Sequence, residues 1–152
     1  MLKNKSPQES AVEKREIVMP NQVNPHGVVF GGQIMAWIDL AAAMVAERHA
    51  ESPVATVHVD SITFKHPIRV GNHVRILARV NYAGKTSMEI GVKVVVENPY
   101  TGISQTTTQA NITMVATDVK GRPQPVHGLV PSSDEEKKSY QAALARKSLR
   151  EK

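Results

Sequence analysis

The feature that most constrains the fold is an apolar run at residues 32–46, in which Asp39 is the only ionisable residue. The run predicts a helix from Gly32 to about Ala50. Such a helix is apolar on nearly every side, so we expect the rest of the chain to cover most of its surface. Burying an unpaired carboxylate costs several kcal/mol. Asp39 is therefore either a structural group satisfied by donors or a functional group.

Several other segments alternate between apolar and polar residues with a period of two, which is typical of strands with one face in a core. These expected strands span residues 73–82, 86–97 and 105–115, and residues 11–18 are expected to form a first strand before them. Tyr82 has the same parity as Val80 and is expected on the same buried face. Turn-forming residues at 83–85 and 98–102 separate the last three strands, which predicts an antiparallel meander. The helix and strands together predict an α+β fold, with a curved antiparallel sheet of about five strands around one long helix.

Residues 54–65 are also strand-like, but the parity of their apolar residues changes along the segment. It switches from Val57 and Val59 to Ile62 and Phe64. Because one inserted residue reverses the faces of a strand, the switch predicts a bulge or an edge strand with two different neighbours.

A chain of 152 residues has the size of a single domain. We assign residues 1–130 to the domain and residues 131–152 to a charged C-terminal tail, helical or flexible. The tail is expected to form a helix N-capped by Ser132 or Ser133. Its apolar stripe is thin, so we expect an appendage or a partly disordered segment. The stripe consists of Tyr140, Leu144 and Leu149.

Composition excludes several classes of protein. The chain has no cysteine, which excludes disulfides, thiolate nucleophiles and cysteine-based zinc sites and is compatible with a reducing compartment. The formal net charge is +5, but aromatic residues make up only 4% and offer little for stacking on bases, so we expect no nucleic-acid partner. The apolar run is too short and too polar to span a bilayer. We expect a cytoplasmic protein that does not enter the membrane.

The loop that leads into the helix, residues 24–32, reads Asn-Pro-His-Gly-Val-Val-Phe-Gly-Gly. Gly31 and Gly32 present backbone N–H groups without side chains at the positive end of the helix. Such amides can stabilise an oxyanion, and the Asp39 carboxylate can activate water or attack a carbonyl carbon itself. Acid and amides together resemble half of an acyl-transfer site.

Residues 24–32, 37–41 and 84–88 together resemble the hotdog-fold acyl-CoA thioesterases of the cytosolic long-chain and broad-specificity hydrolase branch. The resemblance extends over roughly residues 15–117. It implies a hotdog fold that hydrolyses acyl-CoA to a free acid and CoA without a metal or organic cofactor. It also implies a homodimer whose two sheets join edge to edge, assembled further into a trimer of dimers.

The same resemblance implies roles for individual residues. Asp39 corresponds to the catalytic carboxylate, and the amide of Gly31 or Gly32 to the group that binds the thioester oxygen. Asn24 corresponds to a loop asparagine that faces the aspartate of the partner subunit. From the residues alone, Asn24 could instead close the loop as an Asx turn before Pro25.

A second group of residues is expected to bind the substrate. In the turn Gly84-Lys85-Thr86-Ser87, a lysine charge lies beside two hydroxyls and turn amides, which suits the phosphates of CoA. The motif alone is also that of an ordinary hairpin turn. His26 could donate a hydrogen bond to the thioester or to CoA, or it could brace the loop.

No metal site is expected, because the other histidines show neither i, i+4 pairing nor cysteine partners. Two alternatives to a hydrolase remain at this level. One is a hotdog hydratase or dehydratase acting on acyl thioesters, and the other is a non-catalytic acyl-CoA-binding regulatory module.

Overall fold

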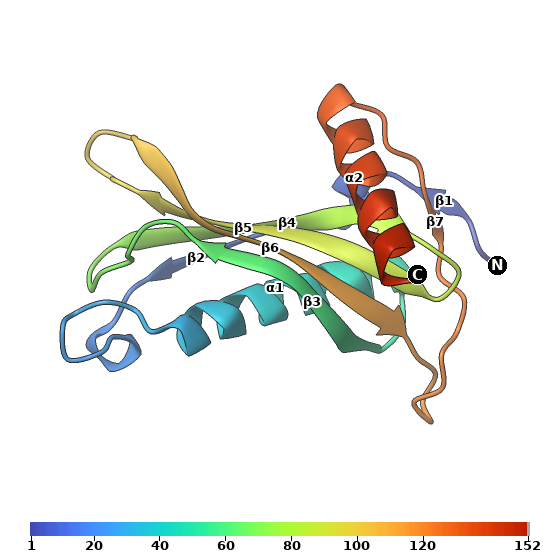
Figure 1. The fold of residues 1–152 in the computed structure, drawn as a ribbon, viewed down its shortest axis with the longest axis horizontal. Coiled ribbons are helices and arrows are strands. Elements are labelled where there is room, and N and C mark those ends of the chain that lie inside the picture. Colours follow the sequence, from blue (N-terminus) through green and yellow to red (C-terminus); the bar gives the residue numbers. More distant parts are fainter. Residues whose placement is uncertain (152) are drawn as a thin grey trace.

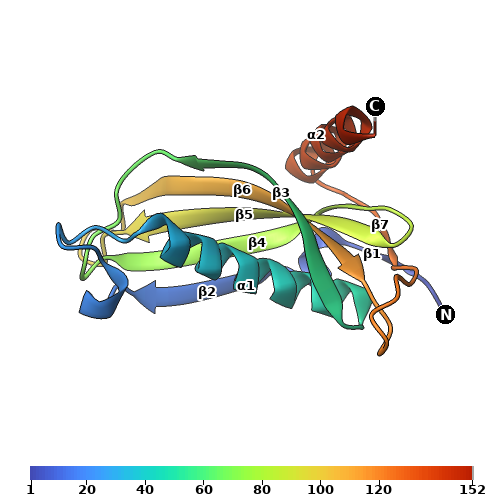
Figure 2. The same cartoon turned by 60° about the horizontal axis from the view of Figure 1, so that its bottom comes forward.

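The computed structural model describes residues 1–151, which form an antiparallel five-stranded sheet with one helix on each face (Figures 1 and 2). The order of strands across the sheet is β2 (Val12–Ile17), β4 (His73–Ala83), β5 (Ser87–Glu97), β6 (Ser104–Ala116) and β3 (Val54–Phe64). The long helix α1 (Gly31–Ala50) covers one face, and α2 (Asp134–Arg150) lies on the other. The expected α+β fold and its meander β4–β5–β6 are confirmed.

Two short strands and a pair of 3-10 turns complete the chain. Strands β1 (Asn4–Lys5) and β7 (Gly128–Leu129) pair in parallel beside the end of α1. The 3-10 turns lie at Pro7–Glu9 and Pro20–Gln22. Within residues 1–151, neither helix has the length and hydropathy needed to cross a bilayer.

Helix α1 buries one face against the inner face of the sheet. Its buried side chains recur every three or four positions, as expected of one helical face, and include Ile34, Trp37, Ile38, Ala41, Ala42, Val45 and Ala46. They belong to the same core as alternate residues of the three central strands, among them Ile76, Ile90 and Ile112. The opposite face of α1 is exposed. The expectation that most of the helix is covered is therefore wrong for a single chain, because the sheet lies on one side only.

Strand β3 forms one edge of the sheet and is irregular, as its changing parity predicted. Its pairing with β6 shifts register between Thr56 and His58, and again between Asp60 and Thr63. Each shift adds residues on one strand and changes which side chains face the helix. The predicted bulge is confirmed.

A second irregularity, in β4, was not expected from the sequence. The register of β4 against β5 shifts between Val80 and Tyr82. The bulge places Tyr82 on the outer face, where its ring lies 5.1 Å from that of Tyr140 in α2. The expectation that Tyr82 shares the buried face of Val80 is wrong, because the inserted residue reverses the alternation.

Helix α2 begins as predicted but packs more closely than its thin apolar stripe indicated. The Ser133 side chain caps it by accepting the Glu136 N–H. Ala143 is buried against the sheet. The Arg146 guanidinium donates two hydrogen bonds, of 2.7 and 2.8 Å, to the buried Glu89 carboxylate of β5. This segment is therefore an ordered helix docked by polar contacts, in contrast to the expected appendage.

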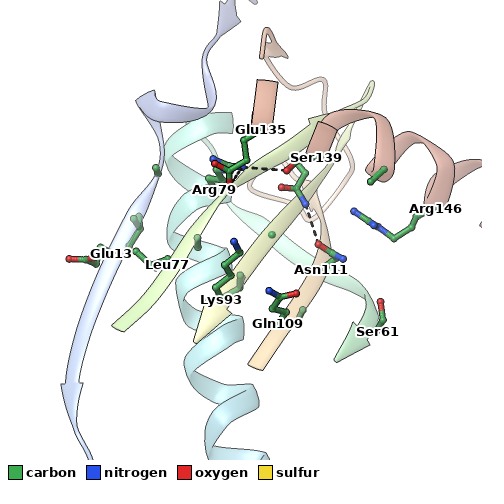
Figure 3. Close-up of a pocket in the computed structure, with 18 of the residues that line it drawn as sticks. Glu13, Ser61, Leu77, Arg79, Lys93, Gln109, Asn111, Glu135, Ser139 and Arg146 are labelled. Carbon is green, nitrogen blue, oxygen red and sulfur yellow. Dashed lines mark hydrogen bonds and ion pairs between the residues drawn. The ribbon is translucent and has the colours of Figure 1, made fainter. Parts of the chain in front are cut away.

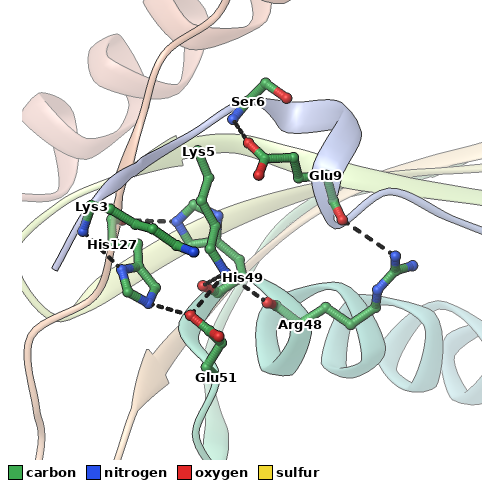
Figure 4. A network of polar contacts seen from close by, with 8 residues as sticks. All are labelled: Lys3, Lys5, Ser6, Glu9, Arg48, His49, Glu51 and His127. Carbon is green, nitrogen blue, oxygen red and sulfur yellow. Dashed lines mark hydrogen bonds and ion pairs between the residues drawn. The ribbon is translucent and has the colours of Figure 1, made fainter. Parts of the chain in front are cut away.

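A network of polar contacts closes the C-terminal end of α1 (Figure 4). The Lys5 ammonium donates to the carbonyl oxygens of Arg48 and His49 at 3.2 and 3.0 Å, and a cation at this end of a helix is stabilised by the helix dipole. It also pairs with Glu51 at 3.1 Å, and this hydrogen bond and charge lower the pKa of the Glu51 carboxyl. Strand β1 is thus tied to the end of α1.

Two histidines join the last part of the chain to the same network. The His127 ring contacts the Glu51 carboxylate through Nε2 at 2.6 Å and accepts the Lys3 N–H through Nδ1 at 3.1 Å. The His49 ring bonds the carbonyl oxygen of His127 at 2.8 Å. Burial lowers the pKa of the His49 imidazole, so the neutral ring is favoured. These histidines are structural.

Candidate active site

The loop before α1 is held by the side chain of Asn24. Its Oδ1 accepts the backbone N–H groups of His26, at 2.9 Å, and Val28, at 3.2 Å. Gly27 lies between them with a φ of 77°, a left-handed conformation that glycine adopts without strain. Asn24 therefore forms the Asx turn that its sequence allowed. Because only the oxygen is used there, the Nδ2 amide of Asn24 remains a donor for another group.

The first amides of α1 are free to bind an oxygen. Phe30 is the N-cap and has no side-chain acceptor, and its carbonyl accepts from Gln33 and Ile34. Within residues 1–151, no backbone acceptor is recorded for the N–H groups of Gly31 and Gly32, and both glycines are exposed. Such amides can bind a developing negative charge at the helix N-terminus.

Asp39 lies on the exposed face of α1, where its carboxylate accepts a hydrogen bond of 2.8 Å from Thr56 Oγ1 of β3. The expected burial of this carboxylate is wrong for a single chain, because Asp39 lies on the flank of α1 beside the edge strand β3, where no further strand within residues 1–151 of the same chain covers it. Thr56 was not identified from the sequence. The sequence carried no signal for it, because the position of Thr56 on the helix side of the sheet follows from its pairing with the buried Met114.

Exposed apolar side chains lie on the same side of the molecule as Asp39 and the free amides. Met35, one turn before Asp39 on α1, is 44% exposed, and Phe64 of β3 is 50% exposed. The Phe64 ring would lie 3.8 Å from a Cβ on Gly31, so it borders the free amides. The face can therefore take an apolar acyl chain or the apolar face of another subunit.

The turn at residues 84–87 lies far from these groups in the same chain. The backbone N–H of Val70, just before β4, donates to the carbonyl of Gly27, so β4 begins beside the loop. The turn follows the eleventh and last residue of β4. At 3.3 Å per residue, the length of β4 places the turn about 35 Å from the loop before α1. Lys85 is exposed there.

The structure thus brings some of the predicted residues together and separates others. Asn24, His26, Gly31 and Gly32 gather at the start of α1, and Asp39 follows two turns later on the same helix. The His26 ring is exposed, and the residue contributes to the loop through its backbone N–H. Within residues 1–151, no group of three His, Asp or Glu side chains is arranged to hold a metal ion.

Comparison with known proteins identifies relatives that match most of this chain. A family model described as "Thioesterase superfamily" matches residues 26–103. A Bacillus subtilis protein named as an uncharacterized acyl-CoA thioester hydrolase, YkhA, is 36% identical over 91% of this chain and 80% of its own length.

Solved structures show the same similarity. An acyl-CoA hydrolase from Staphylococcus aureus, determined with butyryl coenzyme A and coenzyme A, is 36% identical with a TM-score of 0.93, covering 97% of this chain and 90% of that one. A structure described as an apo-hexameric acyl-CoA thioesterase is 38% identical with a TM-score of 0.94, covering 99% and 96%.

Proposed function

We propose, from the premise that this chain belongs to the thioesterase superfamily, that Asp39 is its catalytic carboxylate and that the amides of Gly31 and Gly32 bind the thioester oxygen. The chain has the hotdog fold and is an acyl-CoA thioester hydrolase, as its relatives and structural neighbours are. That similarity favours hydrolysis over a hydratase or a non-catalytic binding module. One observation carries the assignment of Asp39. Thr56 holds its carboxylate by a hydrogen bond on the exposed face of α1, two turns after the free amides at the start of that helix.

The chemistry follows from these groups. Asp39 takes a proton from water, and the resulting hydroxide attacks the thioester carbonyl carbon; alternatively, the carboxylate attacks first and forms an anhydride that water then hydrolyses. In both routes the carbonyl oxygen becomes an oxyanion, which the helix amides stabilise. The C–S bond then breaks, and CoA leaves as a thiol after taking up a proton. The Thr56 hydroxyl fixes the carboxylate through one oxygen and leaves the other for the reaction.

One chain does not supply a complete site. Asp39 lies seven positions after Gly32, which at 1.5 Å per residue is about 10 Å along the same helix face. The first N–H groups of a helix point out of its end, away from Asp39, so an oxygen bound there lies farther still. A carboxylate must come within about 3–3.5 Å of the carbonyl carbon or of its attacking water. The amides and Asn24 of one subunit therefore work with Asp39 of the partner subunit.

Variants of the Staphylococcus aureus hydrolase support the choice of residues. Structures of that enzyme have been determined with alanine in place of one aspartate, one asparagine and one threonine. The intervals between these three positions in that chain equal the intervals between Asn24, Asp39 and Thr56 here. We assign Thr56 as the residue that positions Asp39.

The minimal unit of this proposal is a homodimer formed at β3. Strand β3 is an edge of the sheet, and edge strands offer unpaired backbone groups to another strand. Exposed apolar residues on β3 and α1 would be buried there, including Val57, Leu40 and Met44. Hexameric relatives support an oligomer. We extend the proposal to a trimer of dimers.

The remaining assignments concern the substrate. Lys85, with Gly84, Thr86 and Ser87, would bind phosphates of a CoA molecule whose thioester lies in a site formed with another subunit, because the turn is distant from its own helix amides. His26 would line the entry to that site. The reaction needs no cofactor beyond the CoA that is part of substrate and product. A cytoplasmic location, compatible with the absence of cysteine, is part of the same proposal.

Co-expression of two inactive chains tests whether the site is shared. A dimer of one Asn24→Ala chain and one Asp39→Ala chain has one intact site if the two residues act across the interface. Random assembly at equal amounts yields half heterodimers, so about a quarter of all sites should be active, by the symmetry of a two-fold interface. The chains are co-expressed because tight dimers need not exchange subunits during an assay.

The matched control is the double variant Asn24→Ala/Asp39→Ala, co-expressed with the wild-type chain. A shared site gives about a quarter of wild-type activity in both mixtures. A site within one chain gives no recovery from the two single variants and about half from the control. The second pattern would overturn the shared site. A fully active Asp39→Ala enzyme would overturn the catalytic assignment itself.

A further inference from the structure

A groove lies on the outer face of the sheet, away from Asp39 and the helix amides (Figure 3). Its volume is about 760 Å³, within the range of small-molecule sites. The sheet forms the floor, and one stripe of α2 forms a wall. That stripe contains Glu135, Ser139, Ala142 and Arg146.

The floor of the groove is built of polar side chains around a hollow at Gly91. Arg79 and Asn111 flank Gly91 on the neighbouring strands, while Lys93 stands two residues along β5 beside Gln109. A Cβ on Gly91 would lie 2.7 Å from Oδ1 of Asn81, so only glycine leaves room for that side chain. The amide of Asn81 is in turn fixed, because it donates to Glu89 at 2.9 Å.

Among the residues that the structure describes, the groove contains three positively charged side chains, and carboxylates pair with two of them. Arg146 is neutralised by Glu89, and Arg79 pairs with Glu135 at 3.3 Å. Lys93 lies within the groove and has no carboxylate within ion-pairing distance among residues 1–151. Its diagonal neighbours on β4 are Arg75 and Arg79, of which Arg79 lines the groove, and like charges at such positions repel each other. An anion between Lys93 and Arg79 would relieve this repulsion.

The neutral groups indicate what else the ligand carries. Gln109, Asn111 and Ser139 offer both donors and acceptors, which suit hydroxyl groups. None of the described residues that line the groove is aromatic, so the groove has no platform on which a base could stack. These features favour a phosphate on a polyhydroxylated body over a flat heterocycle.

We propose that this groove binds a small phosphorylated, hydroxyl-bearing molecule of the sugar-phosphate class, with its phosphate on Lys93 and Arg79 and its hydroxyls on Gln109, Asn111 and Ser139. The site is separate from the catalytic groups and does not depend on the proposed catalytic function. The same chemistry has two sources. One is a free metabolite, and the other is the phosphorylated ribose of a CoA molecule held by a neighbouring subunit.

Calorimetric titration of the purified, assembled protein with ribose 5-phosphate tests the proposal, with ribose as the uncharged control. We expect one ribose 5-phosphate per chain. Lys93→Gln removes the unmatched charge and should weaken binding at least tenfold, the effect of losing one charged contact of about 1.4 kcal/mol. Because Lys93 is exposed, the variant should melt at the wild-type temperature.

Two further lysine variants locate the effect. Lys120→Gln removes an exposed lysine outside the groove, and Lys85→Gln removes the lysine assigned to CoA phosphates. Both should bind ribose 5-phosphate as the wild type does. Absence of wild-type binding at millimolar ligand, or unchanged affinity in Lys93→Gln, overturns the proposal.

Kinetics with an acyl-CoA distinguish the two sources. If Lys93→Gln loses ribose 5-phosphate binding and also raises KM, the groove holds the ribose phosphate of CoA. If it loses binding with KM unchanged, the ligand is a separate metabolite. The binding measurement requires no turnover, so it remains valid even if the catalytic assignment of Asp39 fails.

Discussion

Replacing Arg146 by methionine should destabilise the protein strongly, because it leaves a buried charge without its partner. The Glu89 side chain is 3% exposed and receives two hydrogen bonds from Arg146 and one from Asn81. Methionine retains most of the apolar stem of arginine and removes the guanidinium. After Arg146→Met, Asn81 is the only remaining donor among these contacts.

The structure sets the expected size of this effect. Breaking a buried ion pair by removing one partner costs about 3–5 kcal/mol. Arg146 is itself 25% exposed, so water can reach the vacated position and the lower figure, about 3 kcal/mol, applies. For a chain of this length, each kcal/mol lowers Tm by about 2–4 °C, which predicts a loss of roughly 6–12 °C.

Thermal unfolding of Arg146→Met at a fixed chain concentration measures the loss, since oligomerisation makes Tm depend on concentration. The double variant Glu89→Gln/Arg146→Met is the control. It removes the uncompensated charge and keeps a partner for Asn81, so it should melt above the single variant. The reasoning is refuted if Arg146→Met melts within about 1 °C of wild type, or if the double variant melts no higher than Arg146→Met.

Three other substitutions give distinct results. Asp39→Asn keeps the shape of the side chain and should lower kcat by about 100-fold or more, measured as CoA released from acyl-CoA; near-normal turnover contradicts the assignment. Lys85→Ala should raise KM with little change in kcat, an effect that shrinks at high salt, and an unchanged KM at low salt would return Lys85 to an ordinary turn residue. The hydrogen bond from Gln8, followed by the backbone N–H groups at the start of α2, lowers the pKa of Glu136 from 4.5 to about 2. Its stabilising effect is therefore complete above pH 4.5 and is lost as the pH falls towards 2, so urea unfolding should show the gap between wild type and Glu136→Gln closing over that range.

The secondary structure could be predicted because its signals are local. The period-two alternation of β4, β5 and β6 arises from one face meeting the core, and α1 is marked by an apolar run of helical length. The changing parity of residues 54–65 likewise predicted the bulges of β3. Tyr82 was misplaced because the β4 bulge leaves no mark on apolar spacing. The register shift is visible only in the pairing with β5.

The candidate site was predictable where its residues share one segment. Asn24, Gly31 and Asp39 lie within sixteen residues, and their order along the loop and helix carries the resemblance to thioesterases. Thr56 was not predicted as a site residue, because its role depends on which way β3 faces after folding. The exposure of Asp39 was not predicted either. Composition shows that a helix is apolar, but it does not show which sides of the helix the same chain covers.

The docking of α2 was underestimated for a related reason. A count of apolar residues measures the hydrophobic part of a helix interface and misses a polar one. The contact between Arg146 and Glu89 joins residues 57 positions apart and has no local pattern.

The order of strands in the sheet also dictates the order in which the chain can fold. Within residues 1–151 of one chain, strand β3 pairs only with β6, whose first residue, Ser104, is made 40 positions after Phe64 ends β3. During synthesis the β4–β5 hairpin can close early, while β3 waits with both of its edges unpaired. In that interval another nascent chain can pair with it by the same backbone groups. We therefore expect closely spaced ribosomes on the messenger RNA to lower the fraction of chains that reach the native sheet.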